Sequence, residues 1–257
     1  MSSISFDRAA PYYDRTRALD QATLARLVPM VAAELAGDGR VLEIGIGTGR
    51  IALPLIGEGL NVVGVDISRE MLARLRENAH GLPPPVAIAD ATRLPFADHA
   101  FTGAMAAHVL HLIPRWKDAV SEIIRVVRPG GVFVASRGGR TYGGEWWSSV
   151  RREFFRNAGN PAWPPGMDRI EELDEEMASR GAQVRLLPEI AQPESASVNE
   201  LLDLLEQGIW SACWSLDTGT RRGAAQATRV WAADNVGNLD EPRSLTEVLA
   251  WRSYRLP

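Results

Sequence analysis

The 257-residue sequence contains a single cysteine, Cys213, so an internal disulfide and a metal site built from several thiolates are both excluded. No stretch approaches the roughly 18 consecutive apolar residues that a membrane-spanning helix requires. The first residues, MSSISFDRAAPYYDRTR, lack the apolar segment of a secretory signal peptide. We therefore expect a cytoplasmic protein with no membrane partner.

An excess of basic residues is also missing. The chain has 28 Lys and Arg against 32 Asp and Glu, which gives a formal net charge of −4. Proteins that bind nucleic acid through its phosphates usually carry a basic surplus, so nucleic acid is not expected as a partner. The content of 46% hydrophobic and 23% charged residues is that of an ordinary globular protein.

Between residues 41 and 137, short apolar runs alternate regularly with amphipathic segments. Runs that are apolar throughout and alternate with helices are typical of a parallel sheet covered on both faces. The pattern therefore predicts a doubly wound, mostly parallel α/β fold. We expect strands within residues 40–46, 61–68, 85–91, 100–113 and 131–137, and helices within residues 50–59, 68–80 and 116–131.

The pattern changes after residue 137, where Gly, Pro and aromatic residues become frequent. Seven of the eight tryptophans lie in this later part, which indicates that an apolar surface is covered there. We expect helices within residues 168–181, 198–214 and 220–236, one strand within 182–195 and a final strand within 244–257.

The segment VLEIGIGTGR, residues 41–50, places Gly45, Gly47 and Gly49 between a strand and a helix. The dinucleotide fingerprint needs its third glycine one position later, where this chain has Arg50, so an NAD(P)-dependent oxidoreductase is disfavoured. A bare backbone at such a turn still lets a ligand approach the amides at a helix N-terminus. A tight turn with no ligand is the alternative.

Acidic residues follow three successive predicted strands. Glu43 lies within the first strand, where a carboxylate would be costly if buried alone, so a solvated or cation-facing role is expected. Asp66 ends the second strand at the spacing from Gly45 at which an acid binds ribose hydroxyls, and Asp90 closes the third. Together they suit a nucleoside with hydroxyls, an amine and a positive charge. Singly, each is equally explained as a helix cap or turn residue.

Residues 6–137 resemble the class I S-adenosylmethionine-dependent methyltransferases. The resemblance rests on VLEIGIGTGR, VVGVDISREML, IADATRLPFADHAF, HVLHLIPRW and EIIRVVRPGG in this order, and FDRAAPYYDRTR is similar to the ubiquinone and menaquinone branch. It implies a transferase with a seven-stranded Rossmann-like fold and a helical cap inserted late in the chain. The implied reaction moves a methyl group from S-adenosyl-L-methionine to an O, N or C atom of a small, apolar or aromatic molecule such as a quinone, a phenol or a specialised metabolite.

A chain of 257 residues suits one large domain, or one domain with a small appendage, and we expect a single domain that acts as a monomer or homodimer. The expected parts are N-terminal lid helices over 1–40, a cofactor-binding core over 41–137, substrate-cap insertions over 138–166 and 198–238, and a final strand over 239–257. A non-catalytic protein that binds S-adenosylmethionine for a regulatory purpose is the main alternative.

Position by position, the resemblance implies twelve cofactor contacts: Tyr13, Arg17, Glu43, Gly45, Gly47, Gly49, Asp66, Ile67, Met71, Asp90, Ala91 and Ala107. The glycines and Glu43 would face the methionine part, and Asp66 the ribose. Ile67, Met71, Asp90 and the Ala91 amide would surround the adenine, while the Ala107 carbonyl would hold the methionyl amine. Tyr13 and Arg17 match the lid, where the arginine would pair with the cofactor carboxylate; an exposed amphipathic helix is the alternative.

Two histidines, His108 and His111, follow the fourth strand, beside the expected position of the methyl group. His111 is a candidate general base or hydrogen-bond donor, since an ordinary imidazole titrates near pH 6.5. The alternative is that both merely line or pack the pocket. Their HxxH spacing lacks the glutamate of HExxH and a third ligand, so we expect no metal.

Five aromatic residues of the insertions are candidates for the wall of the acceptor site: Tyr142, Trp146, Trp147, Trp210 and Trp214. The alternative is that they form the cap's own core. The segment RREFFR, residues 151–156, contains three arginines that suggest either an anionic acceptor or a solvated helix face, and the solvated face is favoured.

Overall fold

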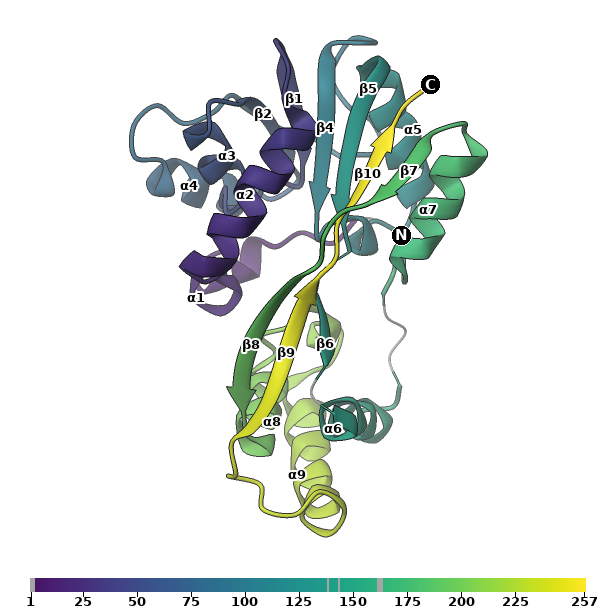
Figure 1. The fold of residues 1–257 in the computed structure, drawn as a ribbon. Helices are drawn as coiled ribbons and strands as arrows, with labels where there is room; N and C mark the ends of the chain where they lie inside the picture. The colour runs from purple at the N-terminus through teal and green to yellow at the C-terminus, as the bar shows by residue number, and fades with distance from the viewer. Residues whose placement is uncertain (1–2, 138, 143, 161–163) are drawn as a thin grey trace. The chain divides into compact units, whose positions relative to one another are not determined.

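The computed structural model describes residues 3–137, 139–142, 144–160 and 164–257 (Figure 1). Contacts divide the chain into two compact units, so the expected single domain contains two separate cores. The first unit comprises residues 1–138, 165–190 and 249–257, and the second comprises 139–164 and 191–248.

The first unit is built on a seven-stranded sheet in the order β3-β2-β1-β4-β5-β10-β7 (Figure 1). Neighbours from β3 to β5 pair in parallel, and β10 runs antiparallel to both β5 and β7. The predicted doubly wound, mostly parallel sheet is confirmed. The strands are β1 (Arg40–Ile44), β2 (Asn61–Asp66), β3 (Val86–Ile88), β4 (Phe101–Ala107), β5 (Val127–Ser136), β7 (Gln183–Leu186) and β10 (Arg252–Arg255).

Helices cover both faces of this sheet, because alternate residues of each buried strand point to opposite sides. Val41 and Val62 pack with one set of helices, whereas Leu42 and Val63 pack with the other. The first set is α2 (Gln21–Leu35), α3 (Ala52–Gly57) and α4 (Arg69–Asn78); the second is α5 (Trp116–Val126) and α7 (Ile170–Ser179). Figure 1 shows the two sets on opposite sides of the sheet.

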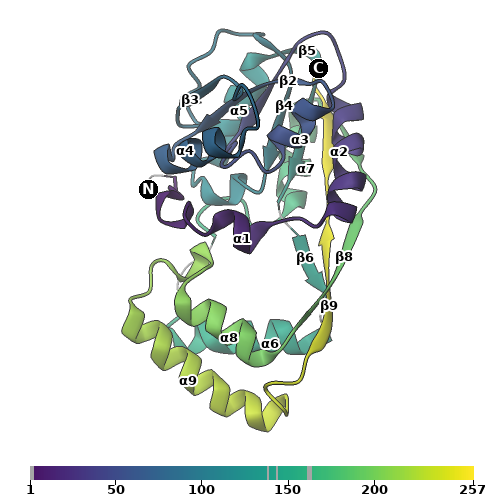
Figure 2. The same cartoon turned by 90° about the vertical axis from the view of Figure 1, so that its left-hand side faces the viewer.

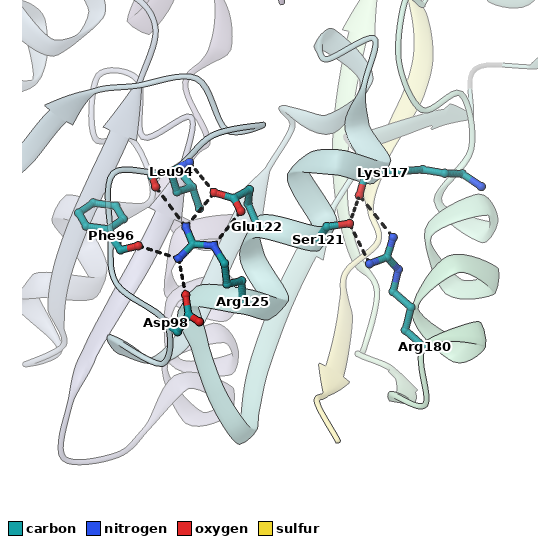
Figure 3. A network of polar contacts seen from close by, with 8 residues as sticks. All are labelled: Leu94, Phe96, Asp98, Lys117, Ser121, Glu122, Arg125 and Arg180. Atoms are coloured by element: carbon teal, nitrogen blue, oxygen red, sulfur yellow. Dashed lines mark hydrogen bonds and ion pairs between the residues drawn. The ribbon is translucent and has the colours of Figure 1, made fainter.

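The loop between β3 and β4 is held against α5 by Arg125 (Figure 3). The Arg125 guanidinium donates to the carbonyl oxygens of Phe96 at 2.7 Å and Leu94 at 3.2 Å, and pairs with Asp98 and Glu122. Glu122 also accepts from the Leu94 amide at 2.7 Å. Hydrogen bonding from Arg125 lowers the pKa of Glu122. These contacts fix the loop between β3 and β4 against the C-terminal end of α5.

The second unit has its own three-stranded sheet, β6-β9-β8, and three helices (Figure 2). The elements are β6 (Gly139–Tyr142), β8 (Ile190–Ala196), β9 (Arg243–Leu249), α6 (Gly144–Asn157), α8 (Val198–Gln207) and α9 (Thr218–Asn235). Their shared core includes Phe154 of α6, Leu205 of α8 and Ala225 of α9, all fully buried. The later tryptophans are concentrated here, as the sequence pattern indicates.

Several expected elements differ from those observed. The strand expected over 100–113 ends at Ala107, and the helix expected over 116–131 ends at Val126, where β5 follows directly. The segments predicted as single strands, 182–195 and 244–257, each form two strands that belong to different sheets. Pro188 lies between β7 and β8 and has no amide hydrogen for a ladder. The helix expected over 198–214 ends at Gln207, because Gly208 adopts φ +71° and ψ +34° as a left-handed cap.

We predict that Leu42→Ala lowers the free energy of unfolding by about 2–5 kcal/mol, because it removes a fully buried side chain from the interior strand β1 and leaves a cavity. The matched control is Leu82→Ala, whose side chain is 97% exposed and should change stability by less than about 0.5 kcal/mol. Urea denaturation of both variants measures the difference, and equal effects would contradict the assigned core.

Candidate functional site

A cleft opens at the carboxyl ends of β1, β2 and β4 in the first unit. It encloses about 640 Å³, its open mouth included. Parallel α/β sheets bind ligands at this edge. Eight of the twelve predicted cofactor residues line the cleft, namely Tyr13, Gly45, Gly47, Asp66, Ile67, Met71, Ala91 and Ala107. Arg17, Glu43, Gly49 and Asp90 are not among its lining residues.

The floor of the cleft is the turn after β1, whose backbone conformation favours glycine. Gly45, Gly47 and Gly49 have φ values of +67°, +58° and +82°, in the left-handed region that side chains rarely adopt. A Cβ at Gly45 would lie 2.6 Å from Val109 Cγ2, and one at Gly47 would lie 3.2 Å from Met71 Cε. The turn therefore presents bare backbone to the cleft.

Asp66 connects this turn to the end of β2. Its Oδ2 accepts a hydrogen bond from the Gly47 amide at 2.9 Å, and its Oδ1 accepts one from the Ser68 amide at 2.8 Å. Burial raises the pKa of Asp66, and the hydrogen bonds from the backbone oppose this effect. The carboxyl group is thus held in one orientation at the edge of the cleft.

The N-terminal segment folds against the same cleft. The Ile4 amide donates to the Leu112 carbonyl at 3.1 Å, and Asp7 accepts from the Ser68 hydroxyl at 2.6 Å. Asp14, in α1 (Tyr13–Arg17), accepts from the Thr48 hydroxyl at 2.6 Å. Ser3, Ile4 and Phe6 line the cleft together with Tyr13.

Glu43 and Asp90 differ from each other in their surroundings. Glu43 is 2% exposed, so the solvated role allowed by the sequence is wrong; Arg50 is the cation that acts on it. Burial raises the pKa of Glu43 well above its usual range, and its Oε2 has no hydrogen-bond partner within the described residues. Asp90 is exposed, and its Oδ1 accepts from the amide and hydroxyl of Thr92, both at 2.9 Å.

Residues 42–135 match a protein family described as a methyltransferase domain. These residues thus form a methyltransferase domain, in agreement with the S-adenosylmethionine-dependent class that the sequence resembles.

Curated relatives of the methyltransferase domain include a phosphatidylethanolamine N-methyltransferase of Cereibacter sphaeroides, 43% identical over 103 residues, which are 38% of this chain and 50% of that protein. A demethylmenaquinone methyltransferase of Renibacterium salmoninarum is 35% identical over 135 residues, which are 51% of this chain and 56% of that protein. The chain spans about half the length of these relatives.

Solved structures share the fold at low sequence identity. The YcgJ protein of Bacillus subtilis has a TM-score of 0.61 and 17% identity, with 93% of this chain and 100% of that chain covered. A type II methyltransferase described as putative, from Anaeromyxobacter dehalogenans, has a TM-score of 0.59 and 23% identity, with 90% and 96% covered.

The two histidines of the methyltransferase domain occupy different places. His108 follows β4 with φ +57°, lines the cleft, and has its Nδ1 at 3.4 Å from Arg50 Nη2. His111 lies in the 3-10 helix η2 (Leu110–Leu112) and is not a lining residue. Burial lowers the pKa of His108 well below its usual range and that of His111 to about 3, and nearby arginines act in the same direction.

The described part of the chain contains neither a candidate metal-binding cluster nor a helix suited to span a membrane. Its His, Cys, Asp and Glu residues form no group of three or more that could hold a metal ion. None of its helices is both long and apolar enough to cross a membrane.

The predicted acceptor residues belong to the second unit. Trp146, Trp147 and Trp210 form a chain of ring contacts with centroid distances of 5.4 and 6.0 Å, and Trp214 Nε1 donates to the Gly208 carbonyl at 3.0 Å. Tyr142 ends β6, and its side chain lies outside the described residues. Their predicted contact with a methyl acceptor stays a prediction.

We predict that acid destabilises the protein in part through His111. Its folded pKa of about 3 lies below the unfolded value of about 6.5, so the unfolded state binds the additional proton between these values. Stability that is present above pH 6.5 is therefore lost as the pH falls, by up to about 1.4 kcal/mol per pH unit.

His111→Gln should remove this contribution, so that unfolding free energies measured between pH 4 and 6 depend less steeply on pH. The control is His80→Gln, which removes an exposed histidine. A slope in His111→Gln equal to that of the unmodified protein would refute the assigned burial effect.

Proposed function

We propose that this protein transfers a methyl group from S-adenosylmethionine to an O, N or C atom of a small molecule. The observation that carries the proposal is the cleft of the first unit, where a left-handed glycine turn and a fixed Asp66 carboxyl group lie together. The methyltransferase family of residues 42–135 supports the same activity. When bound, the cofactor supplies an electrophilic methyl group on a sulfonium.

The residues of the cleft fit the nucleoside part of this cofactor. Asp66 offers carboxyl oxygens to ribose hydroxyls, as acids at the end of the second strand commonly do. Ile67, Met71 and Ala91 all line the cleft; Ile67 and Met71 would provide apolar surface for the adenine, and the Ala91 amide would lie beside it. Asp90 is exposed, and hydrogen bonds from Thr92 orient its carboxyl group. We propose that this carboxyl group accepts a hydrogen bond from the adenine amine.

The methionine part meets the turn after β1 and the end of β4. As the resemblance implies, the Ala107 carbonyl would accept a hydrogen bond from the methionyl amine of the cofactor. The bare backbone of the glycine turn would face the methionine part. Glu43 contributes a buried acid with one oxygen unpaired in the described chain, which favours a positive charge nearby. Tyr13 closes the cleft from the N-terminal segment, and Arg17 from the same helix is proposed for the cofactor carboxylate.

Alignment of the acceptor atom with the methyl group and sulfur accounts for most of the expected rate enhancement. Intramolecular models gain roughly 7–11 kcal/mol from such positioning, whereas a general base adds about 10² to 10⁴ in rate. His111, with a pKa of about 3, stays neutral near pH 7 and is a weak base. We therefore favour hydrogen bonding or packing for His108 and His111 over proton abstraction.

A small acceptor with apolar surface fits the cleft best, because Val109, Leu112 and Ile113 line it beside the methyl position expected near Ala107. The names of the two relatives, which refer to a phospholipid and a demethylmenaquinone, also favour an acceptor with apolar surface. An NAD(P)-dependent oxidoreductase is disfavoured by Arg50 in place of the third fingerprint glycine. A non-catalytic cofactor-binding protein is the remaining alternative.

We predict that Asp66→Asn weakens S-adenosylhomocysteine binding about 10- to 150-fold, since hydrogen bonds to charged groups contribute about 1.5–3 kcal/mol. Calorimetric titration measures the change. The control is Asp38→Asn, an exposed acid outside the cleft, which should bind normally.

The transfer itself is tested with S-adenosylmethionine carrying a labelled methyl group and a panel of phenols, hydroquinones and amines. Label should appear in at least one class of acceptor and be strongly reduced in Asp66→Asn. A protein that binds the cofactor and labels no member of the panel would favour the non-catalytic alternative.

A further inference from the structure

One arginine of α6 occupies a position where an apolar residue is expected. Trp147, Val150, Arg151 and Phe154 follow the spacing i, i+3, i+4 and i+7, which places them on one face of the helix. The other three are buried in the core of the second unit. Arg152 and the ion-paired Arg156 are exposed, as expected for RREFFR, but Arg151 is not.

Arg151 has no counter-ion within the described residues. Its Nε is inaccessible to solvent and lacks a hydrogen-bond partner there, and its guanidinium lies 5.3 Å from the centre of the Trp210 ring. Burial lowers the pKa of Arg151, but a guanidinium stays protonated in proteins. Arg151 is half-buried, and its two Nη atoms are not among the inaccessible unpaired atoms, so the outer part of the guanidinium stays accessible while Nε is buried without a hydrogen bond.

Arg221 of α9 is an arginine of the same unit whose side chain has a structural role, and it serves as a comparison for Arg151. Its Nε donates to the Glu206 carbonyl at 2.9 Å, its Nη1 to the Leu216 carbonyl at 2.5 Å, and its Nη2 to the Thr218 hydroxyl at 3.2 Å. Each nitrogen thus has an acceptor. Arg151 makes no comparable hydrogen bonds within the described chain. A role in linking neighbouring helices through hydrogen bonds therefore does not explain its position.

Two further donors accompany Arg151. The indole nitrogens of Trp146 and Trp147 are buried without hydrogen-bond partners among the described residues. The two rings touch, and Trp147 touches Trp210, which contacts Arg151. Burial raises the pKa of the neighbouring Cys213 thiol to about 11, so Cys213 supplies no negative charge at neutral pH. The unsatisfied atoms of this cluster are donors, which calls for an acceptor from outside the chain.

We propose that Trp146, Trp147, Arg151 and Trp210 form a binding site for an aromatic carboxylate. A single cation is matched by a monoanion, and the planar carboxylate fits the planar guanidinium and accepts further hydrogen bonds. The half-buried indole rings of Trp146 and Trp210 offer flat apolar surface for the aromatic body of the ligand. The site lies within the second unit and requires neither the cofactor nor methyl transfer, so it goes beyond the proposed function.

Calorimetric titration of the full chain with 2-naphthoate, its neutral amide and naphthyl phosphate tests the proposal. The protein should bind naphthoate at least tenfold more tightly than the amide. Arg151→Met should abolish this preference, Arg151→Lys should retain part of it, and the adjacent exposed Arg152→Met should retain all of it. Equal affinities for naphthoate and its amide, preference for the phosphate, or no saturable binding of naphthoate would each overturn the proposal.

A second measurement needs no ligand. Because part of the guanidinium is buried without a hydrogen bond, Arg151→Met should unfold at the same or a higher temperature than the unmodified protein. S-adenosylhomocysteine affinity should be unchanged in this variant, since the residue lies outside the cofactor cleft. A fall of several degrees in the unfolding temperature would show that Arg151 stabilises the fold and would overturn the proposal.

Discussion

The hydrogen bond from the Gly47 amide to Asp66 Oδ2, at 2.9 Å, is the contact on which the candidate site depends. It joins the left-handed turn after β1 to the end of β2, and the same carboxyl group accepts from Ser68 at the start of α4. Ser68 in turn donates to Asp7 of the N-terminal segment. One half-buried acid thus sets the positions of the glycine backbone, a helix terminus and one wall of the cleft.

Buried polar atoms without hydrogen-bond partners are unfavourable for folding, and the charged residues Glu43 and Arg151 each have one within the described part of the chain. Glu43 is a buried acid on the interior strand β1 with one carboxyl oxygen unpaired in the described residues. Arg151 is a half-buried cation beside a separate core formed by the second unit. Burying either group costs free energy, and the expected partners are of opposite kinds: a positive group near Glu43 and a carboxylate near Arg151.

The sheet of the first unit was predictable because its signals are local. Apolar runs such as NVVGVD, bounded by turns and alternating with amphipathic helices, identify buried parallel strands, and their carboxyl ends locate Asp66 and the glycine turn. The division of residues 244–257 between β9 and β10 was not predictable in the same way. Which strand pairs with which depends on contacts between residues distant in sequence, and the run itself carries no signal for that change of partner.

The position of Arg151 could have been found from helical spacing, since it falls four residues after Trp147 and three before Phe154. The charge of RREFFR as a whole instead favours a solvated face, which holds for Arg152 and Arg156.

The central claim is that the cleft binds S-adenosylmethionine, and calorimetric titration with S-adenosylhomocysteine and, separately, with NAD tests this claim most directly. Saturable binding of S-adenosylhomocysteine at one site, with no heat from NAD, is predicted; no binding of S-adenosylhomocysteine, or binding of NAD alone, would contradict it.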